Sequence, residues 1–303
     1  MTCQLKLARL LKPEASLLRS FAVKFVRFDT STQGSGTGLI VLFALVAARP
    51  KLRSELAFRH MGLHVARNTT HFVGQFSWAL AVTLLPFATV FSLEFTTPAW
   101  VALLAALILH ERMTKSRAGS VVLGFLGVLV IVRPGLASFQ PTALLVLFAA
   151  FTFAISLIVT KQLTNRVSTF AIIFWMNLMQ LPMALAWPSM VAATGGPSLF
   201  IFRLGADLLI PTLALGAVGL TSHYCLTQAF RSGDATVVVP LDFLRIPLIA
   251  LVGWMFYGEA LDGFVFAGAG LIICGVLWNL FAESRRPGVP VAASTEKAQS
   301  AGT

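Results

Sequence analysis

The amino-acid sequence predicts an all-α polytopic membrane protein, and composition, segment length and an internal repeat support this fold class. The 303 residues are 57% hydrophobic and only 12% charged, whereas a soluble domain usually carries about 25% charged residues. The mean hydropathy is +0.82. Most residues fall in long apolar segments of the kind that cross a lipid bilayer as helices. Short motifs from the first half of the chain recur in the second half, which indicates a duplicated fold.

Nine apolar segments can be marked along the chain. In order, they cover residues 34–48, 71–85, 88–110, 121–132, 141–160, 170–187, 208–230, 235–257 and 263–281. The first and fourth are shorter than the roughly 20 residues that a span requires, so we expect them to include flanking residues. Pro98, Pro240 and Pro247 lie inside segments and permit kinks, because proline leaves a helical carbonyl unpaired. Glycine and other small residues are dense in the fourth and ninth segments, which predicts close helix packing there.

The basic residues predict the orientation in the membrane. Alternate loops and the C-terminal tail together hold fourteen Lys and Arg residues, among them Arg67, Arg117 and Lys161, whereas the other loops hold two. Loops rich in Lys and Arg stay in the cytoplasm, so the C-terminus is expected inside. The net charge of +11 is therefore interpreted as a topology signal. We expect the lipid bilayer, and no nucleic acid, to be the partner of these charges.

The N-terminal region does not fit this topology, because nine crossings with a cytoplasmic C-terminus place the N-terminus outside. Its bases are Lys6, Arg9, Lys12, Arg19, Lys24 and Arg27. We interpret residues 1–33 as a basic amphipathic segment that replaces a degenerate, missing or misannotated first helix. The predicted organisation continues with a first repeat over 34–135, a second repeat over 136–282 and a disordered cytoplasmic tail over 283–303.

The internal repeat has one fixed offset of 148 residues. It pairs Leu93-Glu94-Phe95 with Leu241-Asp242-Phe243, Glu111 with Glu259, and Gly127-Val128-Leu129 with Gly275-Val276-Leu277. The Glu94 and Asp242 segments are five spans apart, and this odd number predicts that the two copies cross the membrane in opposite directions. Inverted repeats of this kind are typical of secondary transporters, in which the substrate site lies between the two copies.

These motifs resemble a known family. The run Leu93-Glu94-Phe95-Thr96-Thr97-Pro98 followed by His110-Glu111-Arg112, and the glycine-rich run from Gly124 to Gly135, are similar to the EamA domain of the drug/metabolite transporter superfamily. The second copy, around Asp242 and Glu259, resembles the partner domain. The resemblance implies a multi-pass protein of the bacterial inner membrane with ten helices in two inverted five-helix repeats, of which nine are clear here. It also suggests carriers of amino acids or S-adenosylmethionine.

Glu94 and Asp242 are the first candidates for chemistry, with Arg245 beside them. A charged group deep in a span costs about 2.5–3.5 kcal/mol on insertion scales and usually faces a cavity. Either carboxylate could bind a substrate amine or carry a proton, or it could lie at a helix end near the headgroups. Arg245 follows Asp242 by three residues and could form an ion pair with it or clamp a substrate carboxylate. Glu94 has no cation nearby in sequence, which makes it the preferred proton carrier.

Two polar helix faces are the next candidates for substrate binding. One face holds His71, Gln75 and Trp78, and the other holds Tyr224 and Gln228 with His223 beside them. Such faces suit a small polar substrate in a pore, and they equally suit hydrogen bonds between helices. For Thr152, Ser156 and Thr160, which also share a face, we expect helix contacts. Glu111 and Glu259 are expected to act as caps at span ends.

No enzyme signature is present, since the sequence lacks the zinc-protease, serine-hydrolase and phosphate-loop motifs. We expect no cofactor and no metal site. The predicted function is therefore secondary transport of a small polar metabolite by alternating access, with possible proton coupling. The alternative is a membrane scaffold, or an inactive truncated copy of such a carrier.

Overall fold

The computed structural model describes residues 29–56, 58–85, 87–132, 141–193, 206–257 and 263–285. The basic segment up to residue 28, Glu259, and the tail from residue 286 lie outside these ranges. All regular elements in the described part of the chain are helices, as the composition predicts. They are α2 (Asp29–Ala48), η1 (Pro50–Glu55), α3 (Met61–Leu84), α4 (Phe87–Glu94), α5 (Thr97–Leu104), η2 (Ala105–Leu109), α6 (Lys115–Val132), α7 (Ala143–Thr164), α8 (Thr169–Ala193), α9 (Ala206–Ser232), α10 (Ala235–Val238), η3 (Val239–Leu244), α11 (Arg245–Tyr257) and α12 (Gly263–Ser284).

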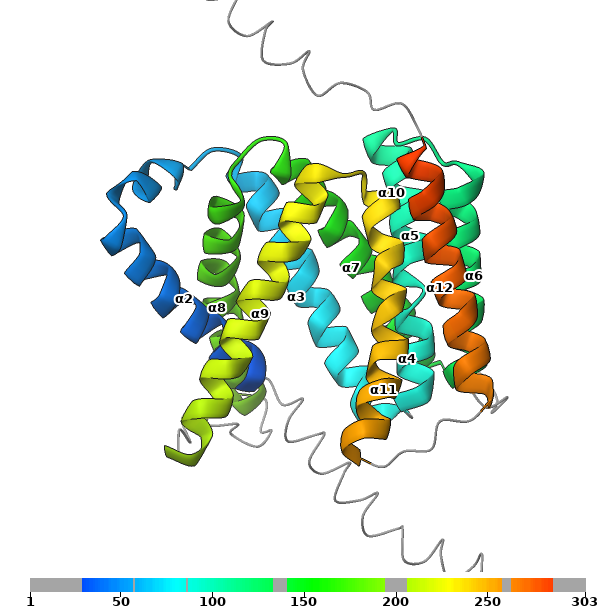
Figure 1. The fold of residues 1–303 in the computed structure, drawn as a ribbon. Coiled ribbons are helices and arrows are strands. Elements are labelled where there is room, and N and C mark those ends of the chain that lie inside the picture. Colours follow the sequence, from blue (N-terminus) through cyan, green and yellow to red (C-terminus); the bar gives the residue numbers. More distant parts are fainter. Residues whose placement is uncertain are drawn as a thin grey trace, which may run out of the picture.

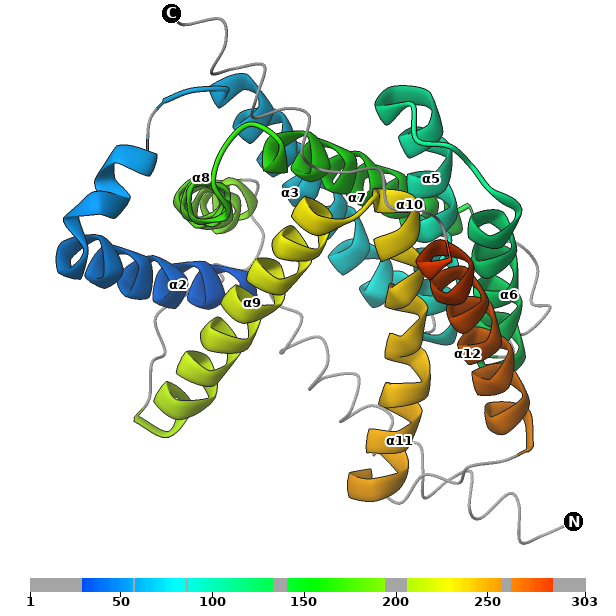
Figure 2. The ribbon, with the colours of Figure 1, turned by 45° about the horizontal axis from the view of Figure 1, so that its top comes forward.

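The helices form two groups that share a central pair. Figures 1 and 2 show α2, α8 and α9 on one side and α4, α5, α6, α11 and α12 on the other, with α3 and α7 between them. Within the described residues, three helices are long and apolar enough to cross a membrane: Thr89–Leu109, Ala143–Thr164 and Gly263–Ser284. These match the predicted segments 88–110, 141–160 and 263–281. The all-helical fold with membrane-span character is thereby confirmed.

The second predicted segment begins ten residues earlier than the hydropathy indicated. We expected a span over 71–85, whereas α3 begins at Met61. The first turns of α3 carry His64, Arg67 and Asn68, and all three side chains are buried. Their polarity lowers the local hydropathy, although they face other helices of the bundle. Arg67, which the sequence placed in a loop, is therefore a helix residue.

Helices α6 and α12 approach closely through small residues, as predicted. A Cβ atom on Gly127 would lie 2.6 Å from the carbonyl oxygen of Gly268, and a Cβ atom on Gly275 would lie 3.4 Å from the Cα of Ser120. From the first contact to the second, the residue number falls along α6 and rises along α12, so the two helices are antiparallel. Adding 148 to Gly127 gives Gly275, and subtracting 148 from Gly268 gives Ser120. The two contacts are therefore equivalent under the offset of the repeat.

Helix α7 packs along α3 through the hydroxyl face predicted to make helix contacts. Thr152 and Thr160 donate to carbonyl oxygens of α7 itself. Ser156 donates to the backbone oxygen of Arg67 over 3.2 Å. Gly74 lets the helices approach, because a Cβ atom there would lie 2.6 Å from the hydroxyl of Thr152. The prediction of a structural role for this face is confirmed.

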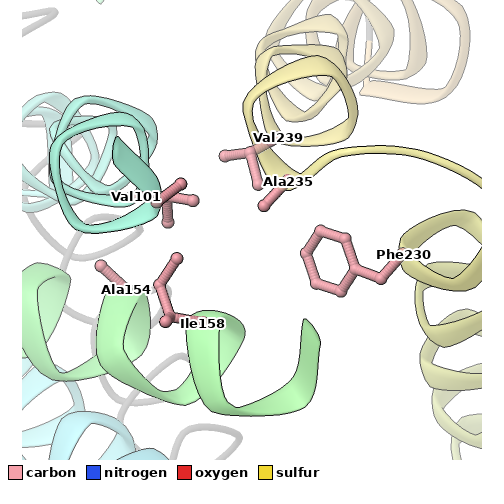
Figure 3. Packing of buried hydrophobic residues seen from close by; sticks show 7 residues of the cluster. Val101, Ala154, Ile158, Phe230, Ala235 and Val239 are labelled. Carbon is pink, nitrogen blue, oxygen red and sulfur yellow. The ribbon is translucent and has the colours of Figure 1, made fainter. Parts of the chain in front are cut away.

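A buried apolar cluster joins both halves of the chain near α10. Figure 3 shows its residues converging from α5, α7, α9, α10 and the start of η3. The labelled members are Val101, Ala154, Ile158, Phe230, Ala235 and Val239. Because the cluster excludes water at this end of the bundle, the polar groups around it must pair with one another.

Both candidate carboxylates lie where a helix is interrupted. Helix α4 ends at Glu94 and a turn follows. Helix α5 then begins at Thr97, with Pro98 as its second residue. In the second half, Asp242 lies in the 3₁₀ segment η3, which separates α10 from α11. Pro240 is the second residue of η3. Proline at the start of each new segment removes a donor that has no helical partner there. Broken helices expose polar backbone and side chains inside a membrane only where protein or a cavity surrounds them.

Candidate functional site

The most constrained candidate is Glu94. Trp78 of α3 donates its indole N–H to one carboxylate oxygen over 2.6 Å. Arg245 at the start of α11 donates to the other oxygen over 3.0 Å. The Glu94 side chain is only 14% exposed. Two helices from distant parts of the chain, α3 and α11, therefore hold the carboxylate at the end of α4.

Arg245 also faces Asp242, at 3.6 Å between the nearest nitrogen and oxygen. The sequence suggested an ion pair with Asp242 and no cation near Glu94. The structure corrects the second point, because Glu94 is the closer of the two carboxylates. The inference that Glu94 lacks a cation was wrong. Arg245 and Glu94 are 151 residues apart in sequence, so no local pattern reveals their contact. One guanidinium thus serves the two repeat-related carboxylates.

Aromatic residues of the repeated motif fix the position of this group. The rings of Phe95 and Phe243 stack with centroids 6.1 Å apart, and both side chains are fully buried. The Arg245 guanidinium lies over the Phe95 ring, 4.9 Å from its centroid. A cation at this distance is attracted to the ring face. The two copies of the Leu-acid-Phe motif therefore meet in the bundle, and Arg245 lies against both of them.

The remaining polar residues of α3 form a second cluster. His71 is bonded to Gln180 of α8, with 3.1 Å between ring nitrogen Nδ1 and the amide nitrogen. Its ring lies 5.9 Å from that of His223 on α9 and 5.6 Å from Phe153. His71 is ten residues from the start of α3, in the interior and away from the helix end. Gln75 lies between this cluster and Trp78 on the same helix face.

Tyr224 and Gln228 differ in their surroundings. The Tyr224 side chain is 48% exposed. Gln228 accepts a hydrogen bond from the Thr169 hydroxyl over 2.6 Å, and Arg231 donates to the same hydroxyl over 3.2 Å. Gln228 thus links α9 to α8, which is the structural alternative that the sequence left open. In the part of the chain that the structure describes, neither residue makes a hydrogen bond or ion pair with Glu94 or Asp242, so the predicted sites do not form a single cluster.

The end of the bundle at α10 holds a charged network that the sequence did not predict. Glu111 accepts hydrogen bonds from the backbone N–H groups of Ala235 and Thr236, each over 2.9 Å, and caps α10. Its expected capping role is confirmed, although the capped helix lies 124 residues away in sequence. The partial positive charge at the N-terminus of a helix also stabilises a carboxylate at this position.

Arg117 is the centre of this network. Its side chain is 3% exposed and pairs with Asp234 over 2.9 Å and with Glu283 over 2.7 Å. On the other side of α10, Lys161 donates to the carbonyl oxygens of Phe230 and Gly233, each over 2.6 Å. The sequence had placed Arg117 and Lys161 in loops as topology signals. They instead tie α6 to α12 and α7 to α9.

Comparison with known proteins adds the family context. The model of the EamA-like transporter family matches residues 20–133 and 140–281. A riboflavin transporter of Brucella anthropi is 30% identical over 275 residues, which cover 86% of this chain and 95% of the relative. An S-adenosylmethionine uptake transporter of Rickettsia prowazekii is 27% identical over 268 residues, covering 88% of this chain and 85% of the relative.

A solved structure shares the fold. It superposes with a TM-score of 0.72 over 89% of this chain and 92% of the solved chain, at 19% sequence identity. At this identity the likeness concerns the fold alone. The arrangement of helices in Figures 1 and 2 is therefore one that another protein adopts with a very different sequence.

Proposed function

Because the chain belongs to the EamA-like transporter family, we propose that it is a secondary transporter that moves a small polar metabolite by alternating access. The family and the named relatives are transporters. The chain is accordingly a multi-pass membrane protein and a transporter of small metabolites, and it is not an enzyme. Mechanism and substrate are the parts that we propose.

The shared ion pair of Arg245 is the observation that carries this proposal. With all three side chains ionised, Glu94, Asp242 and Arg245 have one net negative charge. Glu94 is the largely buried member of this group. An unbalanced charge on a buried carboxylate is costly, so a bound cation or a proton stabilises it. We propose that this group binds either a substrate amine or a proton, and that the occupied and empty states favour different helix arrangements.

Glu94 is the proposed coupling residue within this group. Its two oxygens bind Trp78 of α3 and Arg245 of α11, so neutralising the carboxylate weakens a link between α3 of the central pair and the group that holds α4 and α11. Asp242 then provides the remaining negative charge for Arg245. Proton transfer to Glu94 would thus loosen one link without leaving Arg245 unpaired. Helix interruptions beside both carboxylates support a site inside the bundle.

The repeat architecture is proposed on the same footing. We propose two inverted five-helix repeats, covering residues 34–135 and 136–282, with nine clear spans and the first helix degenerate or missing. The antiparallel contacts between α6 and α12 support this, since they are exchanged by the 148-residue offset. Residue 148 positions after the start of α6 at Lys115 is Gly263, the start of α12.

We further propose that the protein lies in a bacterial inner membrane with its C-terminus in the cytoplasm. The loop charges support this orientation. In the structure, the C-terminal ends of α9 and α12 and the N-terminal end of α6 lie together at the α10 end of the bundle (Figure 1). On this proposal the network of Arg117 lies at the cytoplasmic side.

The proposed substrates are small polar metabolites. Riboflavin and S-adenosylmethionine are the first probes, because two relatives are named as transporters of these compounds. Purified protein in liposomes should take up one probe from a metabolite panel. Glu94→Gln should reduce this flux at least tenfold, with the protein still folded and inserted. Glu55→Gln, at an exposed residue of η1, is the matched control and should keep wild-type flux.

Two results would count against the proposal. Wild-type flux in Glu94→Gln across pH would remove Glu94 from the coupling mechanism. The absence of flux and of any ligand-dependent thermal stabilisation across the whole panel would instead favour the scaffold or inactive-copy alternative.

A further inference from the structure

Arg67 of α3 is a buried cation with no acidic partner in the described residues. Its side chain is 5% exposed. The Nε atom donates to the Thr160 hydroxyl over 3.4 Å and Nη1 donates to the Asn68 side-chain oxygen over 2.9 Å. Both partners are neutral. Within the part of the chain that the structure describes, Arg67 makes no ion pair, and Nη2 makes no hydrogen bond.

The surroundings of Arg67 add further donors and no negative charge. His64 and His71 lie on the same helix, three residues before and four residues after it, so their side chains share its face. His223 of α9 faces His71 with ring centroids 5.9 Å apart. His64 is 1% exposed, and its Nε2 atom has no hydrogen-bond partner in the described ranges. The described side chains around Arg67 are thus basic or neutral.

A guanidinium in this setting is suited to an oxyanion. Removing an unpaired charge from water is expensive, and buried charges are normally paired. Arginine presents a planar fork that matches carboxylate and phosphate oxygens, and two imidazoles can donate additional hydrogen bonds. Intermediate exposure of His71 and His223 leaves this side of the cluster open to a ligand.

We propose that Arg67, His71 and His223 form a subsite for an oxyanion, namely the carboxylate or phosphate group of the transported metabolite. The inference rests on the proposed transport function and narrows its substrate class. His71 and Trp78 are seven residues apart on one helix, or about 10 Å at 1.5 Å per residue. The oxyanion subsite and the Glu94 group would therefore hold opposite ends of an extended metabolite.

Inorganic phosphate is the probe for this subsite. The melting temperature of the purified protein in nanodiscs of phosphatidylcholine alone is measured with phosphate and with chloride at equal ionic strength. Phosphate at ten times its Kd should raise the melting temperature of the wild type by about 2–4 °C. Arg67→Gln should lose the shift, Arg67→Lys should retain part of it, and His223→Asn should weaken phosphate binding about tenfold.

Other arms of the experiment separate the possible origins of the result. Glu94→Gln should keep the full phosphate shift, so loss of transport in that variant and loss of anion binding are distinguishable. Phosphatidylcholine carries a phosphate whose charge its choline balances, so nanodiscs containing phosphatidylglycerol test whether the phosphate of an anionic lipid headgroup occupies the subsite. Stabilisation by that lipid, abolished in Arg67→Gln, supports the oxyanion site with the headgroup as its source.

The proposal fails if phosphate and phosphatidylglycerol both leave the wild-type melting temperature unchanged, a result that needs no variant to fold. It also fails if Arg67→Gln binds phosphate as the wild type does. Wild-type transport with no anion binding would sink this inference while leaving the proposed function in place.

Discussion

Trp78 donates its indole N–H to Glu94 over 2.6 Å and so links the centre of α3 to the end of α4. A hydrogen bond to a carboxylate contributes about 1.5–3 kcal/mol when it is made in only one of two compared states. Trp78→Phe keeps an aromatic ring beside Phe91 and removes only the donor. Flux in liposomes should fall about tenfold if the bond stabilises one transport state.

Trp100→Phe is the control for that substitution. The Trp100 indole nitrogen is buried and has no hydrogen-bond partner among the described residues, while its ring packs edge-on against Phe151. Flux in this variant should equal that of the wild type. Equal flux in both variants would show that the Trp78 donor does not take part in transport.

The two repeat-related carboxylates should differ in their sensitivity to substitution. Arg245 lies 3.0 Å from Glu94 and 3.6 Å from Asp242, and Glu94 is much the less exposed. Asp242→Asn should therefore reduce flux less than Glu94→Gln, because solvent screens an exposed ion pair. Side-by-side flux measurements at matched protein content check the order. The reverse order would place the coupling role on Asp242.

The contact between α6 and α12 predicts a position-specific loss of stability. A Cβ atom on Gly268 would lie 2.6 Å from the backbone oxygen of Gly127, whereas nothing lies within 4 Å of one on Gly270. Gly268→Val should lower the stability by about 1–3 kcal/mol through overpacking. Gly270→Val, two residues away on the same helix, should cause little change. Similar melting temperatures for both variants would contradict the close approach.

The Arg117 network predicts a stability effect at the other end of the same helix pair. Arg117→Gln removes the ion pairs that Arg117 makes with Asp234 and Glu283. We expect a loss of about 3 kcal/mol, the lower end of the range for a broken buried pair, because both acids are partly exposed. Thermal unfolding in detergent measures it. Arg112→Gln, at an exposed residue nearby, should unfold at the wild-type temperature.

Hydropathy predicted the helices well, because lipid-facing segments must be apolar along their whole length. It failed where a helix starts with polar residues that face other helices. Arg67 and Arg117 were assigned to loops for that reason, although both are buried in α3 and α6. The sequence does contain one indication that Arg67 belongs to the helix. Arg67 precedes His71 by four residues and so extends the same helix face.

Local sequence patterns could not identify the hydrogen-bond and ion-pair partners that are distant in sequence. Nothing near Glu94 in sequence indicates Arg245, because that pair forms only when α11 packs beside the break between α4 and α5. The fixed repeat offset gave the best indication, since it paired Phe95 with Phe243 and these rings are stacked in the structure. Periodicity could suggest that Gln228 faces another helix, but the identity of Thr169 as its partner required the fold.

On the proposed mechanism, the single guanidinium between two carboxylates limits the work that the membrane potential can do in each transport cycle. One unbalanced negative charge can accept one monovalent cation in each cycle. Moving one elementary charge through 100 mV releases about 2.3 kcal/mol, which sustains a concentration ratio of about 50 across the membrane. A transporter that used only the Glu94 group would therefore accumulate a neutral metabolite to that order from this voltage alone, and steeper gradients would require a concentration gradient of the coupling ion or a second charge carrier.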